Sequence, residues 1–426
     1  GVLCSLAMTA LSGSTCSAAP YLDTDSSGQY YARCVPDIAG GSTRVFRVRR
    51  DKDELVEEYA QGARRAQEAG FDGVEVHCAH GYLLSGFLSP FQNKRTDEYG
   101  GDTWGRTRIV REILDRTREV VGEDLLIQVR VNGHDYVNGG NTLEDAKEIS
   151  KILVDAGYEA VHVSAGMAPS GQYTFLPAAI PQGYNVYLAE GIKEAVGDSA
   201  PVIAVGAIQD PVFAEEVLAR GNVEFIAIGR ALFADPEWPN KTREGRLSEI
   251  RPCLRCSKSA GVWPEDMRCT VNAAVGKERR YEEKLVPTDD PKEVLVIGAG
   301  PGGLEAARIA ALRGHSVTLV DRNDRIGGKI LVAVIPPDKD NQKQWIEYYE
   351  GQLERLGVEV ELGNELTVAD VLARKPDVVV VATGATPLLP ASIQGLDSPN
   401  VVTSDDILLG EAQAGDNVAI IGGSSM

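Results

Sequence analysis

The chain has 426 residues, 43% of them apolar, and its 62 acidic and 43 basic side chains give a formal net charge of −19. A chain of this length and apolar content buries substantial cores and predicts at least two domains. The negative charge argues against a general nucleic-acid binder, because a surface that follows phosphates needs a basic patch that the sequence does not offer. We therefore expect a small-molecule substrate, with no nucleic acid and no membrane as partner, and we leave homo-oligomer formation open.

The opening segment, GVLCSLAMTALSGSTCSAAP, combines an apolar run with small residues but lacks the basic residues that begin a secretory signal. We interpret it as a strand that enters a small-residue loop, in a chain that starts inside a longer protein; the alternative is a secretory signal. Elsewhere no run of about 18 apolar residues predicts a membrane-spanning helix. The seven cysteines are unevenly spread, which does not resemble a disulfide framework and favours a reduced cytoplasm.

From residue 50 to about residue 235, the sequence alternates between helical segments and short apolar strands. Apolar spacing of helical period predicts helices that each end in glycine, over 51–70, 106–122, 142–157, 188–197 and 210–221. Apolar runs predict parallel strands covered on both faces, starting near residues 73, 125, 159, 201 and 224. Residues 1–8 predict a sixth strand of the same kind.

Repeated βα units of this kind predict an α/β fold of the TIM (β/α)8 type, in which chemistry sits at the carboxyl ends of the strands. Six strands are two fewer than such a barrel needs. Either two strands precede residue 1 in a fuller protein or the barrel is incomplete, and we favour the first interpretation. We assign residues 1–245 to this partial barrel and residues 246–290 to a polar segment that contains three cysteines.

A second domain is predicted over residues 291–426, where a strand over 294–297 leads into a glycine-rich turn and a helix. This order is typical of a Rossmann-like dinucleotide site, because glycines let the backbone approach a pyrophosphate that the helix amino terminus attracts. The acidic residue after the next strand is placed to accept ribose hydroxyls. The site residues are Gly298, Gly300, Gly303, Asp321 and Gly328. A further strand is predicted in PDVVVVATGATP, and NVAIIGGSSM predicts the first strand of a nicotinamide-binding subdomain that is incomplete.

The stretch DGVEVHCAHGYLLSGFLSPFQNKRTDEYGG, followed by RPCLRC and GAGPGG, resembles the old yellow enzyme family. The whole is similar to its larger members, such as 2,4-dienoyl-CoA reductase, trimethylamine dehydrogenase and bile-acid or enoate reductases. The resemblance implies that an FMN-binding barrel, a 4Fe-4S cluster and an FAD domain share one chain. It further implies that NAD(P)H reduces FAD, that the cluster passes single electrons to FMN, and that FMN gives hydride to an electron-poor alkene.

Hydride addition to an enone or enoyl thioester builds negative charge on the carbonyl oxygen, so the site needs hydrogen-bond donors there and a proton source at the alkene. His77 and His80 follow the strand near residue 73 and suit the oxyanion role. Tyr82 matches the family's proton donor. The alternative is that these three side chains merely satisfy one another at the end of a strand.

Further residues are assigned to the cofactors by the same resemblance. Arg130 resembles the arginine that stabilises the reduced FMN ring, because a cation at a strand end in a covered sheet needs an anion; the alternative is an ion pair with a barrel carboxylate. The last two strands end in backbone steps that we assign to the FMN phosphate. These steps are Gly206-Ala207 and Gly229-Arg230.

The cysteine segment matches the family's iron–sulfur pattern at three of its four positions. Cys253 and Cys256 match the first two ligands and Cys269 matches the fourth, whereas the third position is Ser259 or Ala260. A 4Fe-4S cluster uses one protein ligand per iron, so we expect an impaired cluster or one completed from elsewhere in the chain. A zinc site and a segment without metal remain the alternatives.

We therefore expect a flavin- and NAD(P)H-dependent oxidoreductase that reduces an activated C=C bond. One alternative is a catalytically inactive remnant or subunit of such an enzyme, and another is an amine dehydrogenase or demethylase on the same architecture. Three positions depart from the family pattern, with Ala7 and Ala10 where glutamine and histidine are usual, and Met167 where dienoyl-CoA reductase-like members place histidine. These departures weaken the expectation of FMN binding or of dienoyl-CoA specificity.

Overall fold

The computed structural model describes residues 3–6, 20–24, 30–34, 45–47, 52–257, 267–282, 284–386, 389 and 392–422. The predicted roles of Ala7, Ala10, Ser259 and Ala260 lie outside these residues. The chain divides into two compact units, Gly1–Arg230 and Ala231–Met426. Each unit is described by itself, and the three-part division at residues 245 and 290 stays a prediction.

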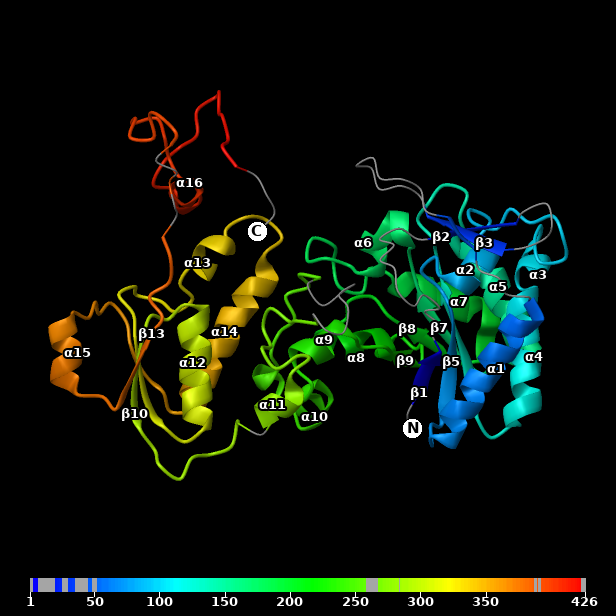
Figure 1. The fold of residues 1–426 in the computed structure, drawn as a ribbon, viewed down its shortest axis with the longest axis horizontal. Helices are drawn as coiled ribbons and strands as arrows, with labels where there is room; N and C mark the ends of the chain where they lie inside the picture. The colour runs from blue at the N-terminus through cyan, green and yellow to red at the C-terminus, as the bar shows by residue number, and fades with distance from the viewer. Residues whose placement is uncertain are drawn as a thin grey trace. The chain divides into compact units, whose positions relative to one another are not determined.

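Unit 1 is built on a parallel sheet of six strands (Figure 1), in the order β1-β5-β6-β7-β8-β9. The strands are β1 Leu3–Leu6, β5 Gly73–Cys78, β6 Leu126–Asn132, β7 Val161–Ser164, β8 Val202–Ala204 and β9 Phe225–Ile226. Neighbours in sequence are neighbours in space, as in a barrel built from successive βα units. The fold is therefore of the TIM-barrel type, and the expected strands, including the one within residues 1–8, are confirmed.

The five long helices described in unit 1 follow the predicted segments, whereas the short helices at 83–88, 103–106 and 171–174 were not predicted. The helices are α1 Lys52–Glu68, α2 Leu83–Leu88, α3 Thr103–Arg106, α4 Arg108–Val121, α5 Leu143–Ala156, α6 Gly171–Thr174, α7 Val186–Val196 and α8 Pro211–Ala219, with short 3-10 turns at Ala168–Ser170 and Gly197–Ser199. Helix α5 shows how the sequence sets such limits. Thr142 and Asp145 form a reciprocal capping box at its start, and Gly157 takes a left-handed conformation at its end.

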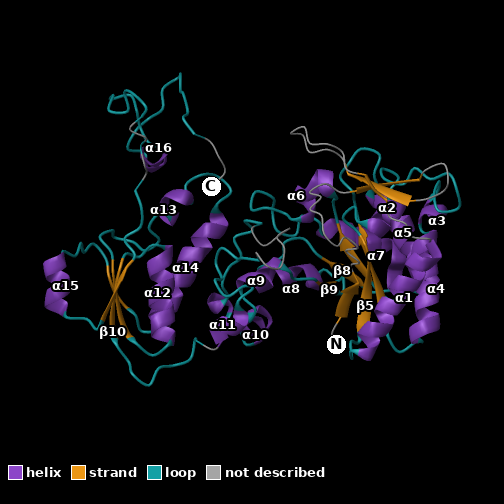
Figure 2. Ribbon diagram, viewed as in Figure 1, coloured by secondary structure: helices purple, strands orange, loops and turns teal. Residues whose placement is uncertain are grey.

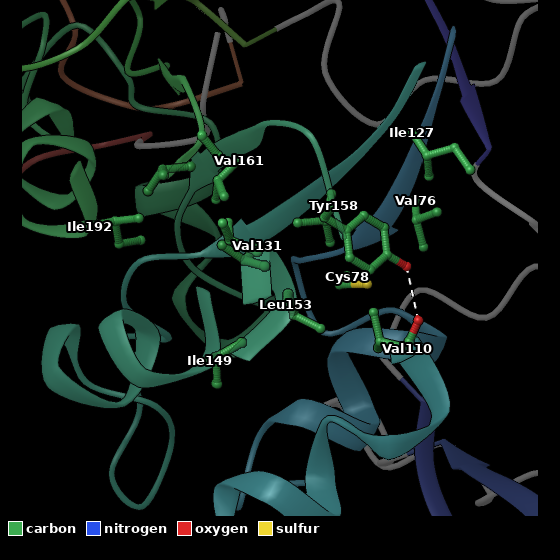
Figure 3. Close-up of a cluster of buried hydrophobic side chains, with 14 of the residues drawn as sticks. Val76, Cys78, Val110, Ile127, Val131, Ile149, Leu153, Tyr158, Val161 and Ile192 are labelled. Atoms are coloured by element: carbon green, nitrogen blue, oxygen red, sulfur yellow. Dashed lines mark hydrogen bonds between the residues drawn. The ribbon is translucent and has the colours of Figure 1, made fainter. Parts of the chain in front are cut away.

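Strand residues at alternate positions pack against these helices and form the core of unit 1 (Figure 3). Val76 and Cys78 of β5 and Val131 of β6 are at most 1% exposed. Tyr158, which precedes β7, is also buried, and its hydroxyl donates a hydrogen bond to the Val110 carbonyl of α4 at 2.9 Å. The core therefore lies between the sheet and the helices, and the other face of the strands is free to carry polar groups.

A three-stranded antiparallel sheet precedes α1 and was not predicted. Its strands are β2 Pro20–Thr24, β3 Tyr30–Cys34 and β4 Val45–Arg47, in the order β2-β3-β4. Strands of three to five residues are too short for an alternating pattern to stand out in a sequence rich in small residues. The sequence pattern therefore indicates a loop in a segment where the backbone forms paired strands.

Unit 2 contains a parallel four-stranded sheet in the order β12-β11-β10-β13 (Figure 2). Its strands are β10 Glu293–Ile297, β11 Ser316–Val320, β12 Glu359–Glu361 and β13 Val378–Val381. Its helices are α10 Trp238–Arg243, α11 Glu278–Glu282, α12 Pro301–Leu312, α13 Ile330–Ala333, α14 Asp340–Arg355, α15 Val368–Arg374 and α16 Ser404–Leu409, with a 3-10 turn at Leu247–Glu249 and α9 Arg230–Ala234 at the unit boundary. The expected Rossmann-like strand–turn–helix is confirmed.

The strand predicted in NVAIIGGSSM is not formed by the described residues of that segment. Residues 417–422 have no strand assignment, and Val418, Ile420 and Ile421 are exposed by 59%, 84% and 73%. A parallel strand needs a neighbour to satisfy its backbone groups, and among the described residues no strand pairs with this segment. The apolar sequence alone therefore gave the wrong local structure here.

In the part of the chain that the structure describes, every helix is either too short or too polar to cross a bilayer.

The glycines of the turn between β10 and α12 are required by close backbone contacts. A Cβ on Gly303 would lie 1.8 Å from the Gly298 carbonyl oxygen, and a Cβ on Gly298, whose φ is +108°, would lie 2.3 Å from the Ala382 carbonyl oxygen. Gly302 is the matched control, because a Cβ there meets nothing within 4 Å. We expect Gly303→Ala to destabilise unit 2 by on the order of 3 kcal/mol and Gly302→Ala to be neutral or slightly stabilising.

Limited proteolysis of the two variants, with the fragments mapped by mass spectrometry, measures this difference. Gly303→Ala should speed cleavage within 291–386 and leave cleavage of unit 1 unchanged. Equal resistance of the two variants would show that the turn tolerates a side chain and would contradict the close approach.

Candidate active site

Polar side chains occupy every second position of three neighbouring strands in the sheet of unit 1. Because successive strand residues point to opposite faces, these side chains share the face that does not pack against the helices. We call this set the polar face; its members are Glu75, His77, Gln128, Arg130, Asn132, His162 and Ser164. The strand register places His77, Arg130 and His162 in one row across β5, β6 and β7. These three strands therefore present one continuous polar surface inside a barrel-type fold.

The structure brings together the three residues predicted for catalysis. His77 lies near the end of β5, His80 follows the strand, and Tyr82 caps the start of α2. The ring centroid of His77 lies 5.0 Å from that of His80 and 5.5 Å from that of Tyr82, and the His80 and Tyr82 centroids are 6.2 Å apart. The Tyr82 side chain is 52% exposed, so its hydroxyl is accessible from solvent. Their catalytic roles stay predictions.

His80 is held from its backbone and from its ring. Its backbone has a φ of +66°, in the left-handed region, and its N–H donates to the Asn132 Oδ1 atom at 3.1 Å. Its ring Nε2 lies 2.6 Å from the Ser164 Oγ atom, and the Arg130 guanidinium donates to the same Oγ at 3.2 Å. A non-glycine residue in this backbone conformation needs such support, and strain of this kind is concentrated at functional sites.

A buried carboxylate lies one row deeper on the polar face. Glu75 is 6% exposed, and its Oε2 atom is 2.8 Å from His162 Nδ1 and 2.6 Å from Gln128 Nε2. Burial alone raises the pKa of Glu75, but the hydrogen bond from His162 and the charge of Arg130 bring it down to about 2. Burial lowers the pKa of His162. Glu75 is therefore ionised at neutral pH, and His162 is neutral with its Nδ1 proton directed at the carboxylate.

The two candidate catalytic histidines are neutral as well. Burial and the nearby charge of Arg130 lower the pKa of His77 to about 4. Burial, followed by the charge of Arg130 and the neighbouring ring of His77, lowers the pKa of His80 well below its usual value. Neutral imidazoles each offer one N–H, so both side chains serve as hydrogen-bond donors without carrying a charge.

The loops that follow β5 and β6 are tied together by a buried aspartate that the sequence analysis missed. Asp135 is 1% exposed and accepts hydrogen bonds from Ser89 Oγ at 2.7 Å, the Asn141 backbone N–H at 2.7 Å and Asn132 Nδ2 at 2.8 Å. Asn132 also donates to the Gly166 carbonyl, so the loop after β7 joins the same network. The available signal was the alternation of polar residues along β6, which continues through Asn132.

Three buried polar atoms of the polar face have no hydrogen-bond partner among the described residues. They are His77 Nδ1, Arg130 Nε and His162 Nε2. Buried polar groups are nearly always paired, so a cluster of unpaired ones on a single face indicates a place where a polar ligand binds. The residues therefore fit a flavin, with Arg130 and His162 as the side chains that would hold its polar edge. Of the alternative, an ion pair for Arg130 with a barrel carboxylate, the structure shows only a longer-range attraction between Arg130 and Glu75.

The two steps predicted to bind the FMN phosphate follow β8 and β9. Ala207 has a φ of +55°, the Gly206 carbonyl accepts from the Gly183 N–H at 2.7 Å, and nothing lies within 4 Å of a Cβ on Gly229. Arg230 donates to the Leu176 carbonyl at 2.8 Å. These steps follow the carboxyl ends of β8 and β9, as His80 follows the carboxyl end of β5. Phosphate binding by them stays a prediction.

Four aromatic side chains form a stacked column on the loops after β6 and β7, and the sequence analysis did not locate it. The ring centroids of His134 and Tyr136 lie 4.4 Å apart, those of Tyr136 and Tyr173 4.0 Å, and those of Tyr173 and Tyr184 5.8 Å. The Tyr136 hydroxyl is also 2.9 Å from that of Tyr187. The column belongs to the carboxyl end of the strands, because the His134 carbonyl accepts from the Gly166 N–H after β7.

In unit 2, the structure brings the predicted dinucleotide-site residues to one turn. Gly300 caps the start of α12, and a Cβ on Gly328, whose φ is +53°, would lie 2.9 Å from the Gly300 Cα atom. Asp321 directly follows β11 and is buried, and its Oδ2 atom accepts from the Ala299 N–H at 2.6 Å. The turn therefore fits a pyrophosphate at the helix start, and Asp321 holds the turn itself, a role that the ribose prediction did not include.

The three cysteines predicted to bind metal all lie in unit 2. Cys253 and Cys269 are half-buried against the core of the unit, while Cys256 is exposed and its sulfur lies 3.2 Å from the Thr270 hydroxyl. Within the described residues, which omit 258–266, no group of three His, Cys, Asp or Glu side chains is placed to hold a metal ion. The described residues thus do not form the predicted cluster site, and no step is derived through it.

Comparison with known proteins gives two family matches. Residues 47–249 match the NADH:flavin oxidoreductase / NADH oxidase family. Residues 255–375 and 292–426 match the pyridine nucleotide-disulphide oxidoreductase family. The first match contains β5 to β9 and the polar face, and the second contains the glycine turn before α12.

Individual proteins of the same arrangement are similar along most of the chain. The NADH oxidase of Thermoanaerobacter brockii is 42% identical over 380 residues, which cover 87% of this chain and 58% of the relative. The cinnamate reductase of Clostridium sporogenes is 34% identical over 388 residues, covering 87% and 57%. A solved 2-naphthoyl-CoA reductase in complex with 2-naphthoyl-CoA superimposes with a TM-score of 0.83 at 33% identity, over 93% of this chain and 61% of that one. The chain thus spans about three fifths of the length of these proteins.

The neutral histidines make the stability of unit 1 depend on pH. His77 has a pKa of about 4 in the fold, so between pH 6.5 and pH 4 the unfolded chain binds a proton that the folded chain does not. Stability is therefore lost as the pH falls below 6.5. For His77 alone we expect the free energy of unfolding to be about 2 kcal/mol lower at pH 5 than at pH 7.

Urea unfolding at pH 7 and pH 5, on the protein and on a His77→Asn variant, tests this expectation. The variant should lose less stability between the two pH values, because one of the groups that must stay neutral is gone. An equal pH dependence of the two proteins would mean that His77 titrates normally in the fold.

Proposed function

Because the chain belongs to the NADH:flavin oxidoreductase / NADH oxidase family, we propose that it reduces an activated C=C bond with electrons from NAD(P)H. The observation that carries the proposal is the convergence of His77, His80 and Tyr82 beside Arg130 on the polar face. The substrate is a small molecule whose alkene is conjugated to a carbonyl, as in an enoate, an enone or an enoyl-CoA. The names of the cinnamate and 2-naphthoyl-CoA reductases support this class.

The side chains of this face supply what the addition of H2 across such an alkene requires. FMN, when bound, supplies the hydride to the β-carbon. Negative charge then develops on the conjugated carbonyl oxygen, where N–H groups of His77 and His80 stabilise it by hydrogen bonds. Tyr82 delivers the proton to the α-carbon from its exposed hydroxyl and regains one from solvent. The hydride and the proton together account for the two hydrogens of the product.

Arg130 acts on the cofactor side of the same reaction. Its guanidinium is always charged, and its Nε proton has no partner among the described residues. A cation with a free donor favours an electron-rich ring edge close by, so it suits a reduced flavin. The turn at Gly298, Gly300 and Gly303 suits the pyrophosphate of FAD, which would receive electrons from NAD(P)H.

Oxidation of an amine on the same architecture is the second candidate. The stacked column of His134, Tyr136, Tyr173 and Tyr184 favours it, because aromatic faces attract cationic substrates. The rings of the column stack on one another, however, and this leaves only the outer faces of the terminal rings, His134 and Tyr184, for a substrate. We therefore place this function second to alkene reduction.

Tyr82→Phe tests the first candidate. We expect the variant, loaded with flavin and reduced by dithionite, to pass electrons to cinnamate or another conjugated alkene about 10²-fold to 10⁴-fold more slowly, because the proton donor is missing. Stopped-flow absorbance of the flavin measures the rate. Reoxidation by O2 in the same variant is the control and should stay unchanged.

Alkene reduction at the original rate by Tyr82→Phe would remove this residue from the mechanism. Flavin reduction on mixing the oxidised protein with secondary or tertiary amines, without reaction of the reduced protein with alkenes, would select the second candidate. No reaction with either class would favour a catalytically inactive relative.

An iron–sulfur cluster on Cys253, Cys256 and Cys269 belongs to the proposal only through its spacing in the sequence. The support is the match to three of four ligand positions, and with three thiolates one iron of a 4Fe-4S cluster lacks a protein ligand.

We expect anaerobic reconstitution to give a cluster that loses this iron on mild oxidation and takes a 3Fe-4S form. Electron paramagnetic resonance and iron analysis measure this. A stable four-iron cluster would reveal a fourth ligand elsewhere, and no iron bound after reconstitution would leave the thiols without a metal role.

We place the protein in the cytoplasm, in a reducing compartment. Cys78, Cys256 and Cys269 are free thiols, which supports this location.

A further inference from the structure

Ser164, a member of the polar face, lies between the Arg130 guanidinium and the ring of His80, which follows β5. It is the last residue of β7 and is 4% exposed. Its Oγ atom is 3.2 Å from an Arg130 guanidinium nitrogen and 2.6 Å from His80 Nε2.

The directions of these two hydrogen bonds follow from the protons available. A guanidinium has donors only, so Arg130 donates to Ser164 Oγ and occupies one of its lone pairs. The hydroxyl has a single hydrogen, and among the described residues His80 Nε2 is the remaining partner of this oxygen. We propose that Ser164 is a positioning residue that donates to His80 Nε2 and thereby fixes His80 as the tautomer protonated on Nδ1.

The opposite direction leaves a proton without a partner. If His80 carried its proton on Nε2 and donated to Ser164, the hydroxyl hydrogen would have no acceptor in a site from which solvent is almost excluded. An unsatisfied buried donor costs about 1–3 kcal/mol. The nearby charge of Arg130 also opposes any additional proton on the ring. The first consideration selects the Nδ1-protonated tautomer, and the second excludes the doubly protonated ring.

This assignment decides which atom of His80 faces the chemistry. The ring is anchored through Nε2, and the backbone of His80 is fixed by Asn132, so the free N–H is the one on Nδ1. Given the proposed alkene reduction, that Nδ1–H is the donor available for the carbonyl oxygen of the substrate. Without the serine, the ring would exchange between tautomers, and only one of them would present a proton at that atom.

His162 provides an internal reference on the same face. Its Nδ1 atom is 2.8 Å from Glu75 Oε2, and because this carboxylate is ionised it accepts the Nδ1 proton. His162 is therefore also protonated on Nδ1, but its tautomer is fixed by Glu75 and not by Ser164. A change at Ser164 should alter the tautomer of His80 and leave that of His162 in place.

Nuclear magnetic resonance of the histidine side chains tests the proposal in the full chain. The protein has five histidines, so selective ¹⁵N labelling gives few signals, and a His80→Gln variant assigns the one that matters. At pH 8, the long-range ¹H–¹⁵N pattern of His80 should show a protonated Nδ1 and a bare Nε2. Ser164→Ala should shift this pattern toward a protonated Nε2, whereas Ser164→Thr, which keeps the hydroxyl, should preserve it.

The signal of His162 shows in each sample whether the polar face is still folded. A protonated Nε2 on His80 in the original protein, or an unchanged His80 pattern in Ser164→Ala beside an intact His162 signal, would overturn the proposal. This readout needs no turnover, so it stands or fails separately from the proposed reaction.

The kinetic consequence is measured with the flavin-loaded, dithionite-reduced protein and cinnamate. Ser164→Ala should lower the rate constant at saturating alkene by on the order of 10-fold or more, with little change in apparent affinity, because the lost donor acts on charge that develops in the transition state. Ser164→Thr should restore most of the rate. A weaker apparent affinity with an unchanged saturating rate would show that Ser164 only shapes the pocket.

Discussion

The arrangement of unit 1 depends on keeping two charged side chains, Glu75 and Arg130, on the covered polar face of its sheet. An ionised group removed from water costs several kcal/mol unless the protein replaces the lost solvation. Glu75 obtains this from His162 and Gln128, and Arg130 obtains part of it from Ser164 and from the charge of Glu75. The Nε proton of Arg130 has no hydrogen-bond partner among the described residues, and this is what makes the face a candidate binding site.

The same constraint accounts for the loops at the carboxyl ends of the strands. Asn132 and Asp135 continue the polar series beyond β6 and link the turns after β5 and β7. Each bond satisfies a buried group that would otherwise destabilise the fold, so site geometry and stability depend on the same contacts. A left-handed backbone at His80 is tolerated because these contacts hold it, and the result is a rigid set of donors.

The sequence predicted the parts of this arrangement that local patterns determine. Helix ends marked by glycine and the strands of the parallel sheet were predicted in this way, whereas His77, Tyr82 and Arg130 were singled out through the family resemblance, and their roles stay predictions. The partners of those residues were missed, because which polar side chains meet across strands depends on register, and one strand does not reveal it. Thus Glu75 was visible two residues before His77, yet its contact with His162 joins strands 87 positions apart. The strand expected at residues 417–421 failed for a related reason, since an apolar run becomes a strand only when a neighbour pairs with it.

The depth of the two charges bears on which reaction the face can promote. Glu75 lies two residues before His77 on β5, so its row is about 6–7 Å further from the carboxyl ends of the strands than the row that contains Arg130. The positive charge of Arg130 is therefore closer to the carboxyl ends of the strands than the negative charge of Glu75. The neutral histidines add no charge of their own. A face with its positive charge nearer the carboxyl ends of the strands attracts negative charge at those ends and repels a cation there. In the proposed reduction, such a face would assist the carbonyl oxygen of the alkene as it gains charge, and it would oppose the binding of an ammonium group, even beside the aromatic column of Tyr136 and Tyr173.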